Sequence, residues 1–177
     1  MFLRAAEQVR ASVPEAAFVL AGEGELIPSL QALASELALA DATFFIGRCD
    51  NIPALLSVSD ICVLSSKAEG FSNSILEYMA AARPVVVTDV GGAREVVEEG
   101  ASGYLVQSGD SETMAARIIH LLQNPREACA MGQRGRQIVE QKFSTTVQLE
   151  RTQEMYDLTL ERGSSREGLP VEGARRA

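Results

Sequence analysis

Five short apolar runs alternate with stretches of helical periodicity, and this alternation restricts the fold more than any other feature of the sequence. The runs are almost wholly apolar and two of them end in glycine, which is typical of strands buried on both faces of a parallel sheet. Strands alternating with helices predict an α/β fold, a Rossmann-like parallel sheet with flanking helices and right-handed crossovers. The strands are expected at residues 16–22, 43–47, 60–66, 84–88 and 104–107.

The helices are expected between these runs and after the last one. Apolar residues three or four positions apart predict helices at residues 2–12, 26–39, 52–58, 73–82 and 93–98, the fourth capped by Ser72 or Asn73. After Asp110 the pattern is helical only: Ser111 is the expected cap of one helix, Pro125 begins a second, and a third runs over about 144–161. We expect one domain at residues 1–162 and a disordered Gly-, Ser- and Arg-rich tail at residues 163–177.

Charge and composition exclude several classes of function. A net charge of −8 argues against a general nucleic-acid binder, which needs a basic face. The three cysteines lie far apart along the chain, so we expect free thiols, with Cys62 in the core. The single histidine, His120, fits a helix surface or packing position, and one histidine excludes a multi-histidine metal site.

Nothing in the sequence predicts a membrane span or a signal peptide. No apolar stretch reaches the roughly 18 residues that a span requires. The first residues carry Arg4, Glu7 and Arg10 where a signal peptide would be apolar. We therefore expect a cytoplasmic protein.

The stretch from Asp60 to Glu98 holds the residues best suited to chemistry. Ligands of open parallel sheets bind outside the carboxyl ends of the strands. Glycine or polar turns fall on that edge after four strands, at Gly22 and Gly24, at Gly47, in the loop to Glu69, and at Gly91 and Gly92. This edge is therefore the candidate site.

Two glutamates flank a helix start in this stretch. Glu69 is placed in the loop, and Glu77 lies in the following helix on the same face as Asn73, four positions earlier. The backbone amides of residues 71–75 would face outward at a helix end that favours an anion. A phosphate there, with carboxylates accepting hydrogen bonds from hydroxyls on either side, outlines a nucleotide-sugar. Many α/β proteins carry such acidic residues without function, and paired carboxylates also suggest glycoside hydrolysis, although nothing shows both flanking one bond.

The same stretch resembles the carboxy-terminal, donor-binding domain of the retaining glycosyltransferases of GT-B fold in group 1, and among these it is similar to glycosyltransferase family 4. The signature is two glutamates separated by seven residues, Glu69 and Glu77. The resemblance covers about residues 1–160. Matching segments are Gly22-x-Gly24, Phe45-Ile46-Gly47, Ser66, Glu69-Gly70-Phe71, Leu76-Glu77, Ala80-Ala81, Pro84-Val85-Val86, Thr88-Asp89-Val90-Gly91-Gly92, Glu95, Gly103-Tyr104-Leu105-Val106, Met131-Gly132 and Lys142-Phe143-Ser144. Two positions depart from the pattern: Ala82 replaces a common glycine, which we interpret as a tolerated packing change, and Ser65 replaces a common proline.

The resemblance also implies roles for individual residues. Glu69 would hold hydroxyls of the donor sugar, as the catalytic residue, and Glu77 would hold the ribose hydroxyls. The loop from Gly47 to Asn51 would lie near the base. The remaining donor-binding residues would be Gly22 and Gly24 beside the nucleotide, Gly70, and Phe71, Ser72, Asn73 and Ser74 through their backbone amides. The chemistry would be sugar transfer with retention from a nucleotide-diphospho-sugar to an acceptor hydroxyl, without a cofactor or required metal.

Members of that family carry two Rossmann-like domains, and this chain matches only the second. The usual first central strand and its Arg and Lys would precede Met1, so we expect a chain truncated at its start. It should be inactive alone and weakly stable, since the strands at 16–22 and 60–66 each lose a partner or must pair directly. The full-length protein is expected in polysaccharide, lipopolysaccharide or glycolipid synthesis, with peripheral association at the inner face of a membrane.

Two alternatives to this interpretation remain. One is a noncatalytic nucleotide-sugar-binding subunit that docks on a separately encoded acceptor domain. The other is a structural α/β module with a degenerate site, which would bind no ligand. The sequence specifies neither the base, the sugar nor the acceptor.

Overall fold

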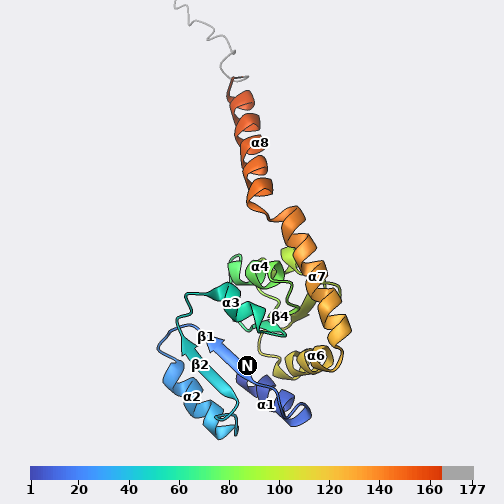
Figure 1. Cartoon of the computed structure of the whole chain (residues 1–177). Coiled ribbons are helices and arrows are strands. Elements are labelled where there is room, and N and C mark those ends of the chain that lie inside the picture. Colours follow the sequence, from blue (N-terminus) through green and yellow to red (C-terminus); the bar gives the residue numbers. More distant parts are fainter. Residues whose placement is uncertain (165–177) are drawn as a thin grey trace, which may run out of the picture. The chain divides into compact units, whose positions relative to one another are not determined.

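The computed structural model describes residues 1–164, and thirteen elements lie in this part of the chain (Figure 1). Residues 1–140 form one compact unit, and a second unit begins at residue 141. The helices are α1 (Phe2–Ser12), α2 (Ile27–Glu36), α3 (Ile52–Ser57), α4 (Asn73–Ala80), α5 (Ala93–Val96), α6 (Ser111–Gln123), α7 (Pro125–Lys142) and α8 (Thr145–Ser164). The strands are β1 (Phe18–Ala21), β2 (Thr43–Gly47), β3 (Cys62–Leu64), β4 (Val85–Thr88) and β5 (Gly103–Val106).

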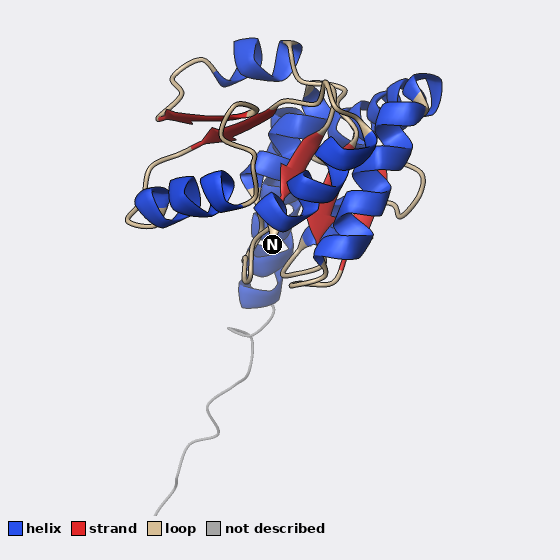
Figure 2. Ribbon diagram, turned by 90° about the horizontal axis from the view of Figure 1, so that it is seen from below, coloured by secondary structure: helices blue, strands red, loops and turns tan. Residues whose placement is uncertain are grey.

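The strands form two parallel sheets, in the orders β1-β2 and β3-β4-β5 (Figure 2). Phe18 is in register with Thr43 in the first sheet, and Val86 is in register with Val63 and Tyr104 in the second. The predicted α/β class with parallel strands and flanking helices is confirmed. Direct pairing of β1 with β3, one of the two expected arrangements, is not seen in the described part of the chain, so each of these strands has a sheet partner on one side only.

Helix α1 connects the first sheet to the core. Its buried side chains are Leu3, Ala5, Ala6 and Val9. The ring of Phe2 meets that of Phe18 on β1 edge to face, with 6.0 Å between centroids, and α1 also packs along α6. The core cluster beneath α1 includes Val86, Tyr104 and Val106 of the second sheet, and β4 is buried along its whole length. The regularly spaced apolar residues of α1 thus belong to one core cluster with residues of both sheets.

Helix α6 begins one residue earlier than the sequence predicts, so its cap is Asp110 and the prediction of Ser111 is wrong. The Asp110 carboxylate accepts hydrogen bonds from the Thr113 backbone amide at 2.9 Å and from the Thr113 hydroxyl at 2.6 Å. These bonds hold the pKa of Asp110 below its ordinary value. Asp and Ser are comparable caps, and the carboxylate is favoured here because its two oxygens reach both groups.

Helices α2 and α4 both end in a Schellman motif with alanine at the left-handed position. Ala38 and Ala82 each have φ +55°. After α4, the Ala82 amide donates to the Met79 carbonyl at 2.9 Å and the Arg83 amide donates to the Tyr78 carbonyl at 3.0 Å. Glycine is the usual residue here because a Cβ is strained at positive φ. The sequence suggested that alanine in place of glycine at residue 82 is a change of packing. The structure shows that it is a change at a position whose backbone is left-handed.

Replacing Ala82 with glycine is expected to stabilise the chain by about 0.5–1 kcal/mol. Relief of left-handed strain contributes about 1–2 kcal/mol, and the greater freedom of glycine in the unfolded chain offsets part of it. Urea unfolding of Ala82→Gly measures the change. The matched control is Ala116→Gly on the exposed side of α6, where the same substitution should cost about 1 kcal/mol. Equal destabilisation by both would contradict the explanation.

Other predictions for single residues agree with the structure. Cys62 is buried, and burial raises the pKa of its thiol to about 12; the three cysteines are free. His120 lies on α6 with Nε2 3.0 Å from Glu127 Oε1. No helix within residues 1–164 combines the length and hydrophobicity that crossing a bilayer demands. Helix α8 extends to Ser164, slightly into the stretch expected to be disordered, and the rest of that tail lies outside the described residues.

Candidate functional site

The loop after β3 and the turn after β4 meet at the carboxyl edge of the second sheet. The Thr88 hydroxyl, at the end of β4, donates to the Ser66 carbonyl at 2.8 Å. The Gly92 amide donates to the Gly70 carbonyl at 2.7 Å. Because β3 and β4 are neighbouring parallel strands, their carboxyl ends lie together, and these two bonds fix the loop of residues 65–71 against the turn of residues 89–92.

Glu69 lies in this loop with an exposed side chain. The hydroxyl of Ser66 donates to Glu69 Oε1 at 2.6 Å, a short bond of the kind that a charged acceptor makes. The bond ties the carboxylate to the end of β3. One carboxylate oxygen is thereby oriented, and the carboxylate has further acceptor capacity for a hydroxyl of a ligand.

The start of α4 follows the loop directly. Ser72 is its N-cap, as one of the two expected residues, but the Ser72 side chain accepts no bond from the first turn. The first-turn amides of a helix have no partner within the helix, and their partial positive charge favours an anion. Ile75 and Met79 are buried and anchor the helix. The amide end of α4 thus follows immediately on the loop that bears Glu69.

Glu77 occupies the exposed side of α4, one turn after Asn73, which is also exposed. The two residues are four positions apart and share a face of the helix, as expected. Next to Glu77, burial raises the pKa of the Tyr78 hydroxyl, and Cys62 and Glu77 add to the effect. Tyr78 is therefore neutral at physiological pH, and Glu77 is the carboxyl group on the exposed side of α4.

The predicted glycines of the first sheet form a second group. The Gly22 amide donates to the Gly47 carbonyl at 2.7 Å, so the turns after β1 and β2 lie together. Gly24 follows in the loop to α2, where its carbonyl accepts from the Ile27 amide at 3.2 Å. Gly22, Gly24 and Gly47 have room for a Cβ, with no atom within 4 Å of the position it would take. The structure thus brings together Glu69 and Gly70 with the start of α4, and separately joins Gly22 to Gly47 on the other sheet.

Two supporting side chains were not predicted as site residues. Thr88 is buried, with 1% of its surface exposed, and its hydroxyl holds the loop at Ser66. Arg94 forms a bidentate ion pair with Asp89, in which Nε lies 2.6 Å from Oδ1, and this bond raises the pKa of Arg94. The sequence signal for Thr88 was its place at the end of an apolar strand, where side chains of the carboxyl edge are expected. Arg94 lies on α5, and only its partner Asp89 directly follows the strand.

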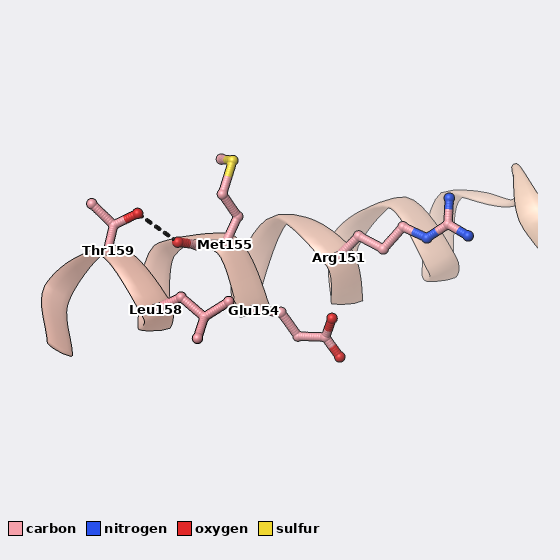
Figure 3. A pocket seen from close by; sticks show the side chains of 5 residues that line it. All are labelled: Arg151, Glu154, Met155, Leu158 and Thr159. Atoms are coloured by element: carbon pink, nitrogen blue, oxygen red, sulfur yellow. Dashed lines mark hydrogen bonds between the residues drawn. The ribbon is translucent and has the colours of Figure 1, made fainter. Parts of the chain in front are cut away.

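The residues that the structure describes hold no cluster of three or more His, Cys, Asp or Glu suited to a metal. A shallow hollow lies along one side of α8, lined by Arg151, Glu154, Met155, Leu158 and Thr159 (Figure 3). The Thr159 hydroxyl donates to the Met155 carbonyl within the helix at 2.7 Å. A hollow made by one face of a single exposed helix has no opposing wall, so it offers a ligand little enclosure.

A protein-family model described as "Glycosyl transferases group 1" matches residues 1–124. EpsD of Bacillus subtilis is 34% identical over 154 residues, covering 87% of this chain and 40% of EpsD. The N-acetyl-alpha-D-glucosaminyl L-malate synthase of Bacillus anthracis is 36% identical over 129 residues, covering 73% of this chain and 34% of that protein. The chain therefore spans roughly a third to two fifths of these relatives.

Among solved structures, HepE of Anabaena in complex with UDP matches with a TM-score of 0.81 and 25% identity, covering 88% of this chain and 44% of HepE. HepE in complex with UDP-glucose matches with a TM-score of 0.80. The crystal structure of the C-terminal domain of a glycosyl transferase group 1 protein, LpcC from Francisella tularensis, matches with a TM-score of 0.75 and 26% identity, covering 81% of this chain and 78% of that domain.

Proposed function

Because the chain belongs to the glycosyl transferases of group 1, we propose that it is the donor-binding half of a glycosyltransferase that uses a nucleotide-diphospho-sugar. The observation that carries the proposal is the Glu69 loop at the carboxyl edge of the sheet, held against the glycine turn and followed directly by the start of α4, where the Ser72 side chain makes no cap. The likeness to HepE, whose structures contain UDP and UDP-glucose, supports the same ligand class. The full-length protein would transfer the sugar to an acceptor held by a second domain.

Each part of the site has a role in this proposal. The diphosphate lies at the start of α4, where the amides of residues 71–74 and the helix dipole compensate its charge. Glu69 accepts hydrogen bonds from the donor sugar, and its bond with Ser66 keeps the carboxylate oriented. Glu77 accepts from the ribose hydroxyls. Gly22, Gly24 and Gly47 leave room for close approach of the nucleoside.

The reaction is transfer with retention at the anomeric carbon. The bond from that carbon to the diphosphate breaks, the acceptor oxygen bonds to the same face, and the acceptor proton passes to the departing diphosphate. Negative charge grows on the diphosphate as it leaves. The partial positive charge at the start of α4 therefore stabilises the transition state more than the ground state. No metal is required for this compensation, and the donor-binding half by itself is inactive.

Calorimetric titration of the chain with UDP, GDP and ADP tests the proposal. We expect one of the three nucleotides to bind, and Glu77→Ala to weaken its affinity about 10- to 100-fold, because hydrogen bonds to a charged group contribute about 1.5–3 kcal/mol. Glu36→Ala, an exposed glutamate on α2, is the matched control and should bind like the unchanged chain. Failure of all three nucleotides to bind would favour a structural module, and unchanged binding in Glu77→Ala would exclude the ribose role.

A further inference from the structure

The turn of Gly91 and Gly92 lies directly against the backbone of the loop that bears Glu69. A Cβ on Gly91 would stand 2.3 Å from the carbonyl oxygens of both Glu69 and Gly70, and 2.8 Å from the carbonyl carbon of Glu69. Gly91 also has φ +55°, a conformation that strains other residues. The closeness of this contact therefore depends on the absence of a side chain at residue 91.

The opposing surface at Gly91 is backbone, which cannot rotate aside as a side chain can. By contrast, a Cβ on Gly92 would meet the ring edge of Phe71 at 2.7 Å, and a ring can turn. Ordinary van der Waals contact begins at about 3.4 Å, so any side chain at residue 91 would displace the Glu69 loop by about 1 Å. The bond from the Gly92 amide to the Gly70 carbonyl would be displaced with it.

We infer that Gly91 is a positioning residue: by allowing the Glu69 loop to lie directly against the glycine turn, it determines where the Glu69 carboxylate lies at the carboxyl edge of the sheet. The inference rests on the proposed donor-binding function, in which Glu69 holds the sugar. The loop is held at two points, at Ser66 by the Thr88 hydroxyl and at Glu69 and Gly70 by the glycine turn. A displacement of about 1 Å in a group that must meet a ligand can cost on the order of a hundredfold.

The test compares Gly91→Ala with Gly100→Ala. Gly100 has φ +73° and no atom within 4 Å of the position of a Cβ, so the control introduces the same backbone strain without the contact. Affinities are measured by calorimetry for UDP-glucose, GDP-mannose and ADP-glucose and for the matching diphosphates. The readout is the ratio of nucleotide-sugar to nucleotide affinity, which reports contacts to the sugar and which a loss of stability alone does not change.

We expect Gly91→Ala to lower this ratio about tenfold, and Gly100→Ala to leave it unchanged. An unchanged ratio in Gly91→Ala, in a chain that binds its donor, would overturn the inference and leave the proposed function intact. Absence of binding by the unchanged chain would overturn the proposed function and the inference with it. If Gly91→Ala gives no cooperative unfolding transition, Thr88→Val tests the other attachment of the loop, because it removes the hydroxyl and keeps the volume. An unchanged affinity ratio in Thr88→Val would then show that the position of the loop does not determine sugar binding, and it would overturn the inference.

Discussion

Gly132→Ala is expected to destabilise the chain by about 1–2 kcal/mol. Gly132 lies on α7, where a Cβ would stand 2.1 Å from the Ala82 carbonyl oxygen, 2.7 Å from the Ala82 carbonyl carbon and 3.2 Å from the Pro84 nitrogen. These are backbone atoms of the turn between α4 and β4, so α7 must move outward. Overpacking of this kind commonly costs about 1–3 kcal/mol, and here it outweighs the gain of about 1 kcal/mol in helix propensity.

Gly135→Ala, one turn further along α7, is the matched control. The three atoms nearest to its Cβ would be side-chain atoms of Met79, at 3.3–3.5 Å, and methionine adapts readily. It should therefore be neutral or stabilise the chain by up to about 1 kcal/mol through helix propensity. Thermal and urea unfolding should place the Tm of Gly132→Ala roughly 5–10 °C below that of Gly135→Ala. Similar Tm values for the two variants would show that α7 does not rest on this turn.

Glu69→Gln is expected to weaken binding of the nucleotide-sugar by about 10- to 100-fold while leaving the affinity for the free nucleoside diphosphate unchanged. Glutamine keeps the size of the side chain but loses the charged acceptor, which contributes about 1.5–3 kcal/mol to its hydrogen bonds. Glu77→Gln should instead weaken both ligands by the same factor, because ribose is common to them. Competition between UDP-glucose and UDP, or the corresponding pair for another base, measures both effects.

The contrast between the two glutamates is the informative result, and Glu36→Gln on α2 serves as the control for removing one surface charge. If Glu69→Gln also weakens the affinity for the free nucleoside diphosphate, Glu69 contacts the phosphates instead of the sugar. Equal patterns for Glu69→Gln and Glu77→Gln would refute the division of roles between them.

The sequence predicted the order of the elements because that order is carried by local periodicity. The strand at Thr43–Gly47 and the pair of Glu69 in a loop with Glu77 on a helix were predicted as they stand. Strands β1 and β3 were predicted longer than they are, because the residue pattern does not show where pairing with the neighbouring strand begins and ends. Local pattern thus predicts which elements exist better than where they end.

Features that depend on distant contacts or on backbone dihedral angles were not predictable. An alanine does not itself indicate a positive φ, and the glycine that is common at residue 82 was interpreted as a matter of packing; the positive φ follows from how α4 ends. The hydrogen bond from Thr88 to Ser66 joins residues 22 positions apart, and the contact of Gly91 with the Glu69 carbonyl exists only after β3 and β4 pair. Only Ser111 was predicted as the cap of α6. Asp110 caps the helix instead, because its two carboxylate oxygens accept from both the amide and the hydroxyl of Thr113.

The whole Glu69 site belongs to one continuous segment, from β3 through α4 and β4 to the glycine turn, and this has a consequence for the order of folding. Contacts that are close in sequence form early because little loop entropy opposes them. The site can therefore assemble with the three-stranded sheet as one cooperative unit, before or without the β1-β2 pair. In the proposed donor complex, local opening of the two-stranded sheet would free the nucleoside end of the donor while the sugar end stays ordered.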